Sequence, residues 1–449
     1  MLKRITYYFV VCMMGVCCAA MGRAQSVYEV GVLCPWSNKA SGIASLMVRD
    51  AEATDERINQ AEPVIVLGDM EHPLEISFDQ LSHDTHLYSY TLLLLNADGS
   101  PASLSPSEYI SGFNSADITD YEHSFNTHQL YTHYRISFPN DDMQPLLSGN
   151  YALIIYENGN PKDVQAVVRF AVVEPIVSIQ ATHNPNSRNN RKGYHQQIDV
   201  DVQLNDIHIT NPEEIKLIVS QNGRTDNRAL APRPTYIEPN KLRWVDCPSL
   251  LFEGGNEYRR LDIGSEYLMG AQVDQVVFDQ TTQTYHAFLF PSENLSTAPY
   301  QTEPDADGAF VINRERNDYD DTEADYMWVH FSLPVAQPWL DGTLYVLGDA
   351  WHNTLTPDNR MQYSDNHGKG NPNDSGGAYT FSCYLKQGGY NWQYVFLTKE
   401  ARLNHQSATL LRTEGSHWQT GNTYRIYVYY RPFGARYDRL VGCIVFSTH

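Results

Sequence analysis

The sequence has 449 residues and a formal net charge of −21, from 53 acidic and 32 basic side chains. Nucleic acids and anionic lipids are therefore excluded as favoured partners, because both are themselves negatively charged. Thirty tyrosines, 28 glycines and 23 prolines, together with few long helical patterns, predict an all-β protein.

The first 24 residues have the features of a secretory signal peptide. Lys3 and Arg4 form a basic start, residues 5–20 are apolar, and residues 22–24 offer a small-residue cleavage site before Gln25. Its removal takes away three cations and no acid, so the mature charge is −21 − 3 = −24. No later run approaches 18 apolar residues, so we expect no membrane-spanning helix.

Seven cysteines occur, and three of them lie in the signal peptide. An acylated cysteine in that segment, as in a lipoprotein, is disfavoured because Met-Gly-Val is a poor match to the small residue that normally precedes it. The remaining Cys34, Cys247, Cys383 and Cys443 are far apart and form no CxxC motif. An oxidising compartment permits one or two disulfides, although Cys383 lies in a strand pattern typical of a buried thiol.

Residues 25–175 are predicted to form a first, immunoglobulin-like β-sandwich, because short alternating strands are separated by turn residues. The predicted strands are residues 63–68, 74–78, 87–95, 131–136, 151–156 and 166–173. Residues 176–317 are predicted to form a middle β-rich domain. Its strands are expected at residues 197–202, 215–219, 272–278 and 285–290.

Residues 318–449 are predicted to form a third, early-set-like sandwich, after a charged stretch that reads as a linker or long loop. Its strands are expected at residues 327–333, 342–348, 378–397 and 424–430. Within residues 378–397, apolar and polar side chains alternate on both sides of Gly388-Gly389. This pattern predicts a β-hairpin with a glycine turn and one face in the core.

Several groups of polar residues resemble metal or catalytic sites in composition, but their spacing does not fit such sites. His123, His128 and His133 recur every fifth residue, but in a strand this spacing places His128 on the opposite face. Asp305 and Asp307 before Gly308 fit an Asp-Gly turn better than a calcium loop, because the ligand register fails. The acidic residues between 318 and 325 read as a solvated loop. No nucleotide, protease or hydrolase motif occurs, so no cofactor, metal or catalytic residue is expected.

Aromatic side chains are the better indication of a binding surface. Trp351, Trp392 and Trp418 could stack on a sugar or anchor a protein, whereas the core of a sandwich would also use such residues. The segment from Leu344 to Trp351, with Met361 and residues 379–396, loosely resembles the early-set sandwich of glycogen-binding modules.

A closer resemblance covers nearly the whole mature chain. It rests on several short strings in a fixed order: residues 106–113, 131–134, 148–151, 221–224, 252–259, 385–388, 414–416 and 436–442. Through them the chain resembles the plug protein family of the Bacteroidetes type IX secretion system. One departure is residues 96–99, where the family pattern would place a tryptophan after the aspartate.

The resemblance implies a role that is not catalytic. It suggests a periplasmic protein that binds the large outer-membrane β-barrel translocon and closes its inner mouth when no cargo complex is engaged. Loops of the last domain are the expected contact sites, with Lys386, Gln387, Arg436 and Trp351 as candidates. Two other classes remain open: a periplasmic or surface glycan-binding protein, with Trp351 and Trp392 as a stacking pair, and a secreted glycan-active enzyme.

Overall fold

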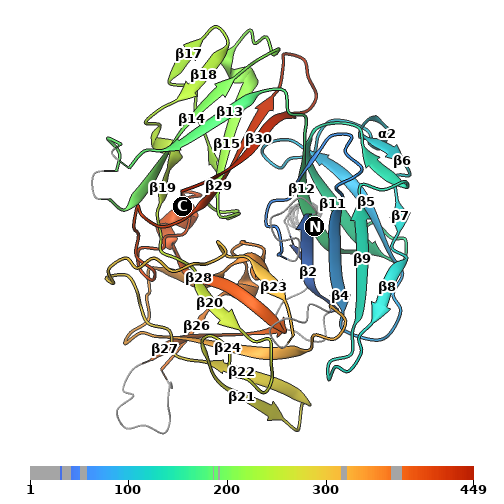
Figure 1. Cartoon of the computed structure of the whole chain (residues 1–449), viewed down its shortest axis with the longest axis vertical. Helices are drawn as coiled ribbons and strands as arrows, with labels where there is room; N and C mark the ends of the chain where they lie inside the picture. The colour runs from blue at the N-terminus through green and yellow to red at the C-terminus, as the bar shows by residue number, and fades with distance from the viewer. Residues whose placement is uncertain are drawn as a thin grey trace, which may run out of the picture.

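The structure is a computed structural model that describes residues 31–32, 42–50, 58–185, 187–190, 193–314, 321–365 and 377–448. The predicted signal peptide and Cys34 lie outside these residues. The described chain forms three β-sandwiches placed around the middle of the molecule (Figure 1). Helical elements are few and short: α2 (Pro106–Tyr109), α3 (Lys399–Leu403), and the 3-10 helices η1 (Pro212–Glu214), η2 (Pro248–Leu250), η3 (Asp349–Trp351) and η4 (Pro357–Asn359). The prediction of an all-β fold with tandem sandwiches is confirmed.

The first sandwich packs a six-stranded sheet on a four-stranded sheet. The larger sheet contains, in spatial order, β1 (Gly31–Val32), β12 (Val164–Val173), β11 (Gly149–Glu157), β5 (Tyr88–Leu95) and β7 (Ala116–Asp117), with β3 (Val64–Val66) also paired to β12. The smaller sheet contains β2 (Ile43–Asp50), β4 (Leu74–Gln80), β9 (Thr132–Phe138) and β8 (Asp120–His123). A short ribbon of β6 (Ile110–Gly112) and β10 (Met143–Pro145) lies beside them. Alternate residues such as Ile76, Leu92 and Leu153 share one buried core.

The second sandwich combines residues from the middle and the end of the chain. One sheet contains β13 (Ser178–His183), β14 (His195–Gln203), β18 (Lys241–Trp244) and β17 (Tyr236–Glu238), with β19 (Leu251–Glu253) also paired to β14. The other contains β16 (Ala229–Leu230), β15 (Ile215–Gln221), β29 (Thr423–Tyr430) and β30 (Arg439–Ser447). Val200, Leu217, Trp244 and Ile426 belong to the core between them.

The third sandwich has a sheet of four strands and a sheet of five. The first contains β20 (Arg259–Asp262), β28 (Gly388–Thr398) and β23 (Phe310–Ile312), with β25 (Gly342–Leu347) also paired to β28. The second contains β21 (Val273–Asp279), β22 (Thr284–Leu289), β24 (Tyr326–Pro334), β27 (Ala378–Lys386) and β26 (Gln362–Ser364).

Strand pairing crosses the boundary that the sequence places between residues 317 and 318. β15 pairs with β29 over seven residue pairs, from Ile215 with Tyr430 to Gln221 with Tyr424. In the other direction, β20, β21 and β22 precede this boundary yet belong to the third sandwich. The second and third sandwiches are therefore interleaved along the chain.

The predicted hairpin at residues 378–397 is wrong, although both of its strands exist. β27 pairs with β24 and β26, whereas β28 pairs with β20, β23 and β25, so the chain crosses from one sheet to the other at Gln387. Gly388 does not have a positive φ. A Cβ there would lie 2.2 Å from the carbonyl oxygen of Val311, so the glycine permits close approach of β23 rather than a turn.

The alternation within this segment is nevertheless confirmed. Phe381 and Leu385 on β27 and Trp392 and Phe396 on β28 all belong to the core of the third sandwich. The two strands thus face each other across the core from opposite sheets instead of lying side by side.

Candidate functional site: a buried ion network and an exposed hairpin tip

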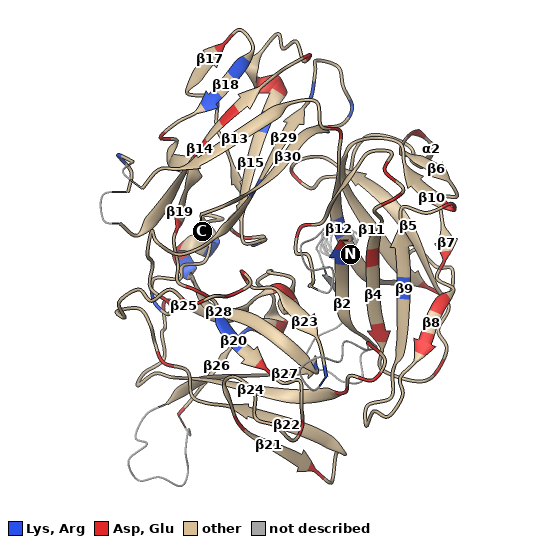
Figure 2. Ribbon diagram, in the orientation of Figure 1, with Lys and Arg blue, Asp and Glu red and all other residues tan. Residues whose placement is uncertain are grey.

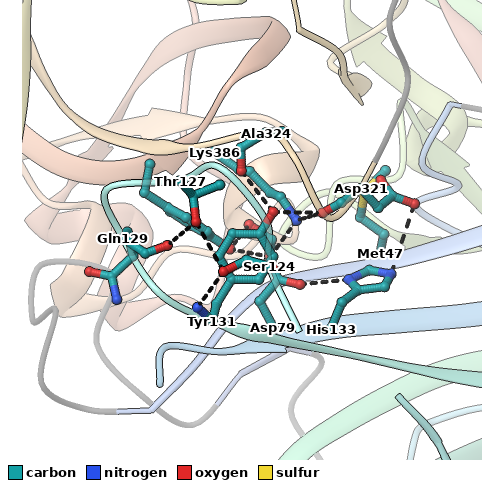
Figure 3. A network of polar contacts seen from close by, with 12 residues as sticks. Met47, Asp79, Ser124, Thr127, Gln129, Tyr131, His133, Asp321, Ala324 and Lys386 are labelled. Atoms are coloured by element: carbon teal, nitrogen blue, oxygen red, sulfur yellow. Dashed lines mark hydrogen bonds and ion pairs between the residues drawn. The ribbon is translucent and has the colours of Figure 1, made fainter. Parts of the chain in front are cut away.

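A buried ion network joins the first sandwich to the third (Figure 3). At its centre Lys386 Nζ lies 2.6 Å from Asp79 Oδ2, and His133 Nδ1 lies 2.6 Å from Asp79 Oδ1. The Tyr326 hydroxyl donates a third hydrogen bond to Asp79 at 2.6 Å. Asp79 and His133 come from β4 and β9, whereas Tyr326 and Lys386 come from β24 and β27, so these contacts cross the sandwich interface.

The charges at this centre are almost completely removed from water. Asp79 is 0% exposed and Lys386 1% exposed. Burial alone would raise the pKa of Asp79, but Lys386 and His133 together hold that pKa below its ordinary value. Burial and the neighbouring Asp79 carboxylate raise the pKa of Tyr326 well above its usual value. The cluster is therefore built on the salt bridge between Lys386 and Asp79, with Tyr326 as a neutral donor.

A second layer of contacts surrounds this centre and involves the segment that begins at Asp321. Arg49 makes two 2.8 Å hydrogen bonds to the Asp321 carboxylate. The Tyr131 ring lies 4.2 Å from Lys386 Nζ, and its hydroxyl donates to the carbonyl oxygens of Asp321 and Ala324 at 2.8 Å. These contacts fix the start of β24 against the first sandwich.

Gln387 and Asp325 extend the network by backbone contacts. Asp325 accepts hydrogen bonds from the backbone N–H groups of His128 and Gln129 at 2.6 and 3.0 Å. The Gln387 side-chain oxygen accepts from the backbone N–H of Asp325 at 2.8 Å. The corner at which the chain changes sheets is therefore also the corner that binds the first sandwich.

Three of the four predicted partner-binding residues are buried. Lys386 and Gln387 belong to the ion network, with 1% and 2% of their surfaces exposed. Trp351, in η3, is 2% exposed and packs against Phe331 and Phe381. None of these side chains can reach a partner in this conformation, because the chain's own sandwiches enclose them.

The fourth predicted residue, Arg436, lies on an exposed hairpin tip. The tip spans residues 431–438 between β29 and β30. Phe433 at its end is fully exposed, and the Arg436 side chain is 57% exposed. Arg436 pairs with Glu108 of α2, and this hydrogen bond lowers the pKa of Glu108 to about 2.

The base of this tip is held rigidly by Asp438, which is 0% exposed. Its carboxylate accepts two hydrogen bonds of 2.9 Å from Lys216 Nζ and one of 3.0 Å from the backbone N–H of Ala97. Asp438 thus connects the tip to β15 of the second sandwich and to residues 96–99 of the first sandwich, the loop that differs from the family pattern.

Acidic side chains gather elsewhere, on β4 and on the exposed edge strand β8 (Figure 2).

The other residues considered in the sequence are mostly structural. Trp392 is 1% exposed, so the predicted stacking pair of Trp351 and Trp392 is wrong, whereas Trp418 is 39% exposed. The His128 ring packs against Phe278 and Tyr285, whereas the His133 ring contacts Asp79, so the two rings share no partner. Among the described residues, no group of three or more acidic, histidine or cysteine side chains could hold a metal ion.

The acidic stretch and the cysteines also differ in part from expectation. Asp318 and Asp320 lie outside the described residues, while Asp321 and Asp325 are in the ion network rather than in solvent. The Asp-Gly turn is confirmed, since Asp307 has φ 51° and its carboxylate accepts from Thr423. Cys247, Cys383 and Cys443 are all free thiols in the described part of the chain.

The network residues Asp79, His133 and Arg49 were missed from the sequence. The available signal was an aspartate near the end of β4, a strand whose residues 76–80 are all buried. An ionised side chain at such a position needs a partner. Nothing local identified that partner as a lysine 307 residues away.

These features define a class of protein: three β-sandwiches joined through buried polar contacts, with an exposed aromatic tip. Residues 44–174 match the family model of the type 9 secretion system plug protein 1st domain. The chain belongs to the type IX secretion system plug family, and this membership implies an envelope location and an association with the secretion machinery.

A solved structure extends the similarity beyond this domain. It is the crystal structure of a hypothetical protein from Parabacteroides merdae, 35% identical, with a TM-score of 0.83. The alignment covers 93% of this chain and 100% of that one, so all three sandwiches are shared. No curated protein matches the chain. In the part of the chain that the structure describes, no helix is long and apolar enough to cross a membrane.

Proposed function

We propose that the protein is a non-catalytic periplasmic plug of the type IX secretion translocon. It binds the large outer-membrane β-barrel and seals its periplasmic opening when no cargo complex is engaged. The family assignment carries this proposal, because it links the chain to the secretion machinery.

The buried ion network supports the proposal physically. A pore wide enough for folded cargo leaks unless a rigid body blocks it. Two sandwiches connected only by a flexible segment would be a poor seal, because relative motion is the default between weakly joined domains. Here the fully buried pair of Lys386 and Asp79 fixes the first sandwich against the third, and Asp321 adds a partly buried pair with Arg49.

The exposed hairpin tip is our candidate for the contact with the barrel. A seal must be reversible, which suits a moderate interface with a few aromatic and arginine anchors. Phe433 and Arg436 supply one of each on a base fixed by Asp438. Since the glycan-stacking pair is buried, no observation favours the glycan-binding alternative.

The test is a pull-down of the full mature chain in native detergent, scored for recovery of the barrel. The wild-type chain is expected to recover it, and a deletion strain is expected to leak small molecules across the outer membrane. If the wild-type chain never recovers the barrel, the plug function is refuted.

A variant of the hairpin tip tests the proposed contact site separately from the plug function. F433A/R436A is expected to reduce recovery at least tenfold at an unchanged melting temperature, as for loss of interface anchors. F290A/R233A, also on the surface and on other parts of the chain, is the matched control and should bind normally. If both variants bind as the wild type does, the hairpin tip is not the contact although the function stands.

A further inference from the structure

Strand β21 forms one edge of the five-stranded sheet of the third sandwich, at the end of the molecule opposite the second sandwich (Figure 1). Among the described strands it pairs only with β22, so one side of its backbone has no strand beside it. Within the described part of the chain, the backbone of residues 275–278 makes no hydrogen bond outside this pair. An edge of this kind presents N–H and C=O groups that an added strand can bind.

The centre of β21 lacks the features that normally protect a sheet edge from pairing. Charged side chains and proline are the usual protection, and residues 275–278, Gln-Val-Val-Phe, contain neither. The edge strand β8 of the first sandwich, in contrast, carries Asp120 and Glu122. A register shift between Val273 and Gln275 distorts only the start of β21. The regular part of this edge is therefore suited to pairing.

Apolar side chains border the open edge on both faces of the sheet. Val276 packs against the core of the third sandwich, whereas Val277, on the opposite face, is 44% exposed. Phe278 lies beside Tyr285 of β22, with 4.8 Å between the ring centres. His128 of the first sandwich packs on both rings but makes no described hydrogen bond to the β21 backbone. An added strand would thus have apolar neighbours on each of its faces.

The loop before β21 adds an ordered apolar surface. Its residues 267–269, Tyr-Leu-Met, are all exposed. The Ser265 hydroxyl accepts hydrogen bonds of 3.2 Å from the backbone N–H groups of Tyr267 and Leu268, which fixes the loop. Burial and the neighbouring Tyr267 hydroxyl raise the pKa of Tyr285 to about 12, so the loop lies against β22. Contiguous exposed apolar surface of this kind marks an interaction site.

The charges around the edge favour a basic partner. Residues 262–290 contain four carboxylates and no lysine or arginine. Asp274 and Asp279 stand on either side of the uncharged part of β21, and no ion pair of the described residues includes them. A second copy of this chain would bring the same carboxylates to the edge, and the net charge of −21 also opposes self-association. The chemistry of the edge therefore fits a strand of a different protein.

We propose that β21 binds an extended segment of a partner protein by strand addition. The segment has apolar residues at its centre and lysine or arginine at its ends. Its backbone pairs with residues 275–278, and its basic side chains contact Asp274 and Asp279. The inference rests on the open edge and does not depend on the plug function.

The experiment is hydrogen exchange of the full mature chain, read by mass spectrometry, together with isothermal titration. The probe is the peptide acetyl-Lys-Thr-Val-Thr-Val-Thr-Lys-amide, whose β-branched residues favour an extended strand. One control peptide has proline at the central threonine, and the other has glutamate in place of both lysines. We expect the probe to bind with a Kd below about 1 mM and to slow exchange in β21. Each control peptide should bind about tenfold more weakly.

Matched variants test the position of the added strand. V277K places a cation at the centre of the edge and should weaken binding of the probe about tenfold or more. V445K, at another exposed strand valine, is the control and should bind as the wild type does. D274N/D279N should bring the affinities of the lysine and glutamate peptides to within about twofold of each other. Val277 and Val445 are both exposed, so both variants should fold, and the melting temperatures verify this.

Five results would overturn the proposal. The first is unchanged exchange in β21 at about 5 mM probe. The second is that the proline peptide protects β21 as well as the probe does. The third is that a folded V277K chain binds the probe as the wild type does. The fourth is a dimer in sedimentation that V277K dissociates, because a second copy then covers the edge. The fifth is flotation with phosphatidylethanolamine vesicles that V277K abolishes, because lipid then covers it.

Discussion

Replacing Lys386 by methionine tests whether the buried ion network holds the first and third sandwiches together. Methionine keeps much of the apolar stem but removes the ammonium group that lies 2.6 Å from Asp79 and 4.2 Å from the Tyr131 ring. Removing one partner of a buried pair typically costs 3–5 kcal/mol, because the other charge stays buried and uncompensated. Since His133 and Tyr326 still contact Asp79, we expect the lower end, about 3 kcal/mol.

The assay is urea unfolding, followed by tryptophan fluorescence and by limited proteolysis of the segment that begins at Asp321. K386M is expected to lower the midpoint and to make this segment more sensitive to protease, since it loses its contact with the first sandwich. K162M, which removes an exposed lysine, is the matched control and should change stability by less than about 0.5 kcal/mol.

A second substitution separates the charge from the packing. D79N/K386M removes both charges and leaves an amide that can bond to His133 and Tyr326. The double variant is therefore expected to recover at least half of the lost stability. If K386M costs less than about 1 kcal/mol, or if D79N/K386M is no more stable than K386M, the salt bridge does not hold the sandwiches together.

Three further predictions follow from other buried groups. Burial raises the pKa of Asp349 to about 7, so Asp349 binds a proton in the folded state at a pH where it is ionised in the unfolded state. The free energy of unfolding should therefore fall by about 2 to 3 kcal/mol between pH 5 and pH 7. D349N, whose amide can bond to Asn353, should remove this pH dependence in urea titrations, and an unchanged pH dependence would refute the assignment. Asp79 has a lowered pKa, so its stabilisation is present above its unfolded pKa and is lost as the pH falls through the folded one; D79N should flatten the acid limb of a plot of melting temperature against pH, and a limb of wild-type steepness would contradict this. A Cβ on Gly254 would lie 2.0 Å from the carbonyl oxygen of His417, whereas a Cβ on Gly159 would meet no atom within 4 Å. G254A should lower the free energy of unfolding by about 3 kcal/mol, and G159A, at a position with positive φ, by about 1 kcal/mol. Equal losses in urea unfolding would count against the close approach at Gly254.

The positions of the strands were accessible from the sequence because alternation is a local property. Residues 74–78, 151–156 and 166–173 were predicted and lie within β4, β11 and β12. The core faces of β27 and β28 were likewise evident from every second residue. A buried face needs apolar side chains at period two whatever strand lies beside it.

Strand partners were not accessible, because pairing depends on distant segments. Gly388-Gly389 has the composition of a hairpin turn, yet Gly388 serves the close approach of β23. Tyr424 to Tyr430 reads as a strand of the last domain, yet its partner β15 begins at Ile215. Nothing in the residues flanking either strand distinguishes these outcomes.

The candidate site was only partly predictable for a related reason. Arg436 lies in a loop rich in proline and glycine, and such loops are exposed. The sequence predicts a turn at Lys386 as well, but this residue ends β27 and is covered by residues from a different sandwich. Burial that arises between sandwiches leaves no periodic signal in either one.

The interleaving of the sandwiches dictates the order in which the protein can be completed. β29 and β30 are synthesised after every other described strand, and they supply half of one sheet of the second sandwich. Until they arrive, β15 lacks its main partner, and Ala171 and Val173 of the first sandwich lack the strands that cover them. Long-range pairing of this kind forms slowly and leaves apolar surface open to aggregation. A chain truncated before Thr423 therefore cannot complete the second sandwich, and the fold closes only after β30 has been synthesised.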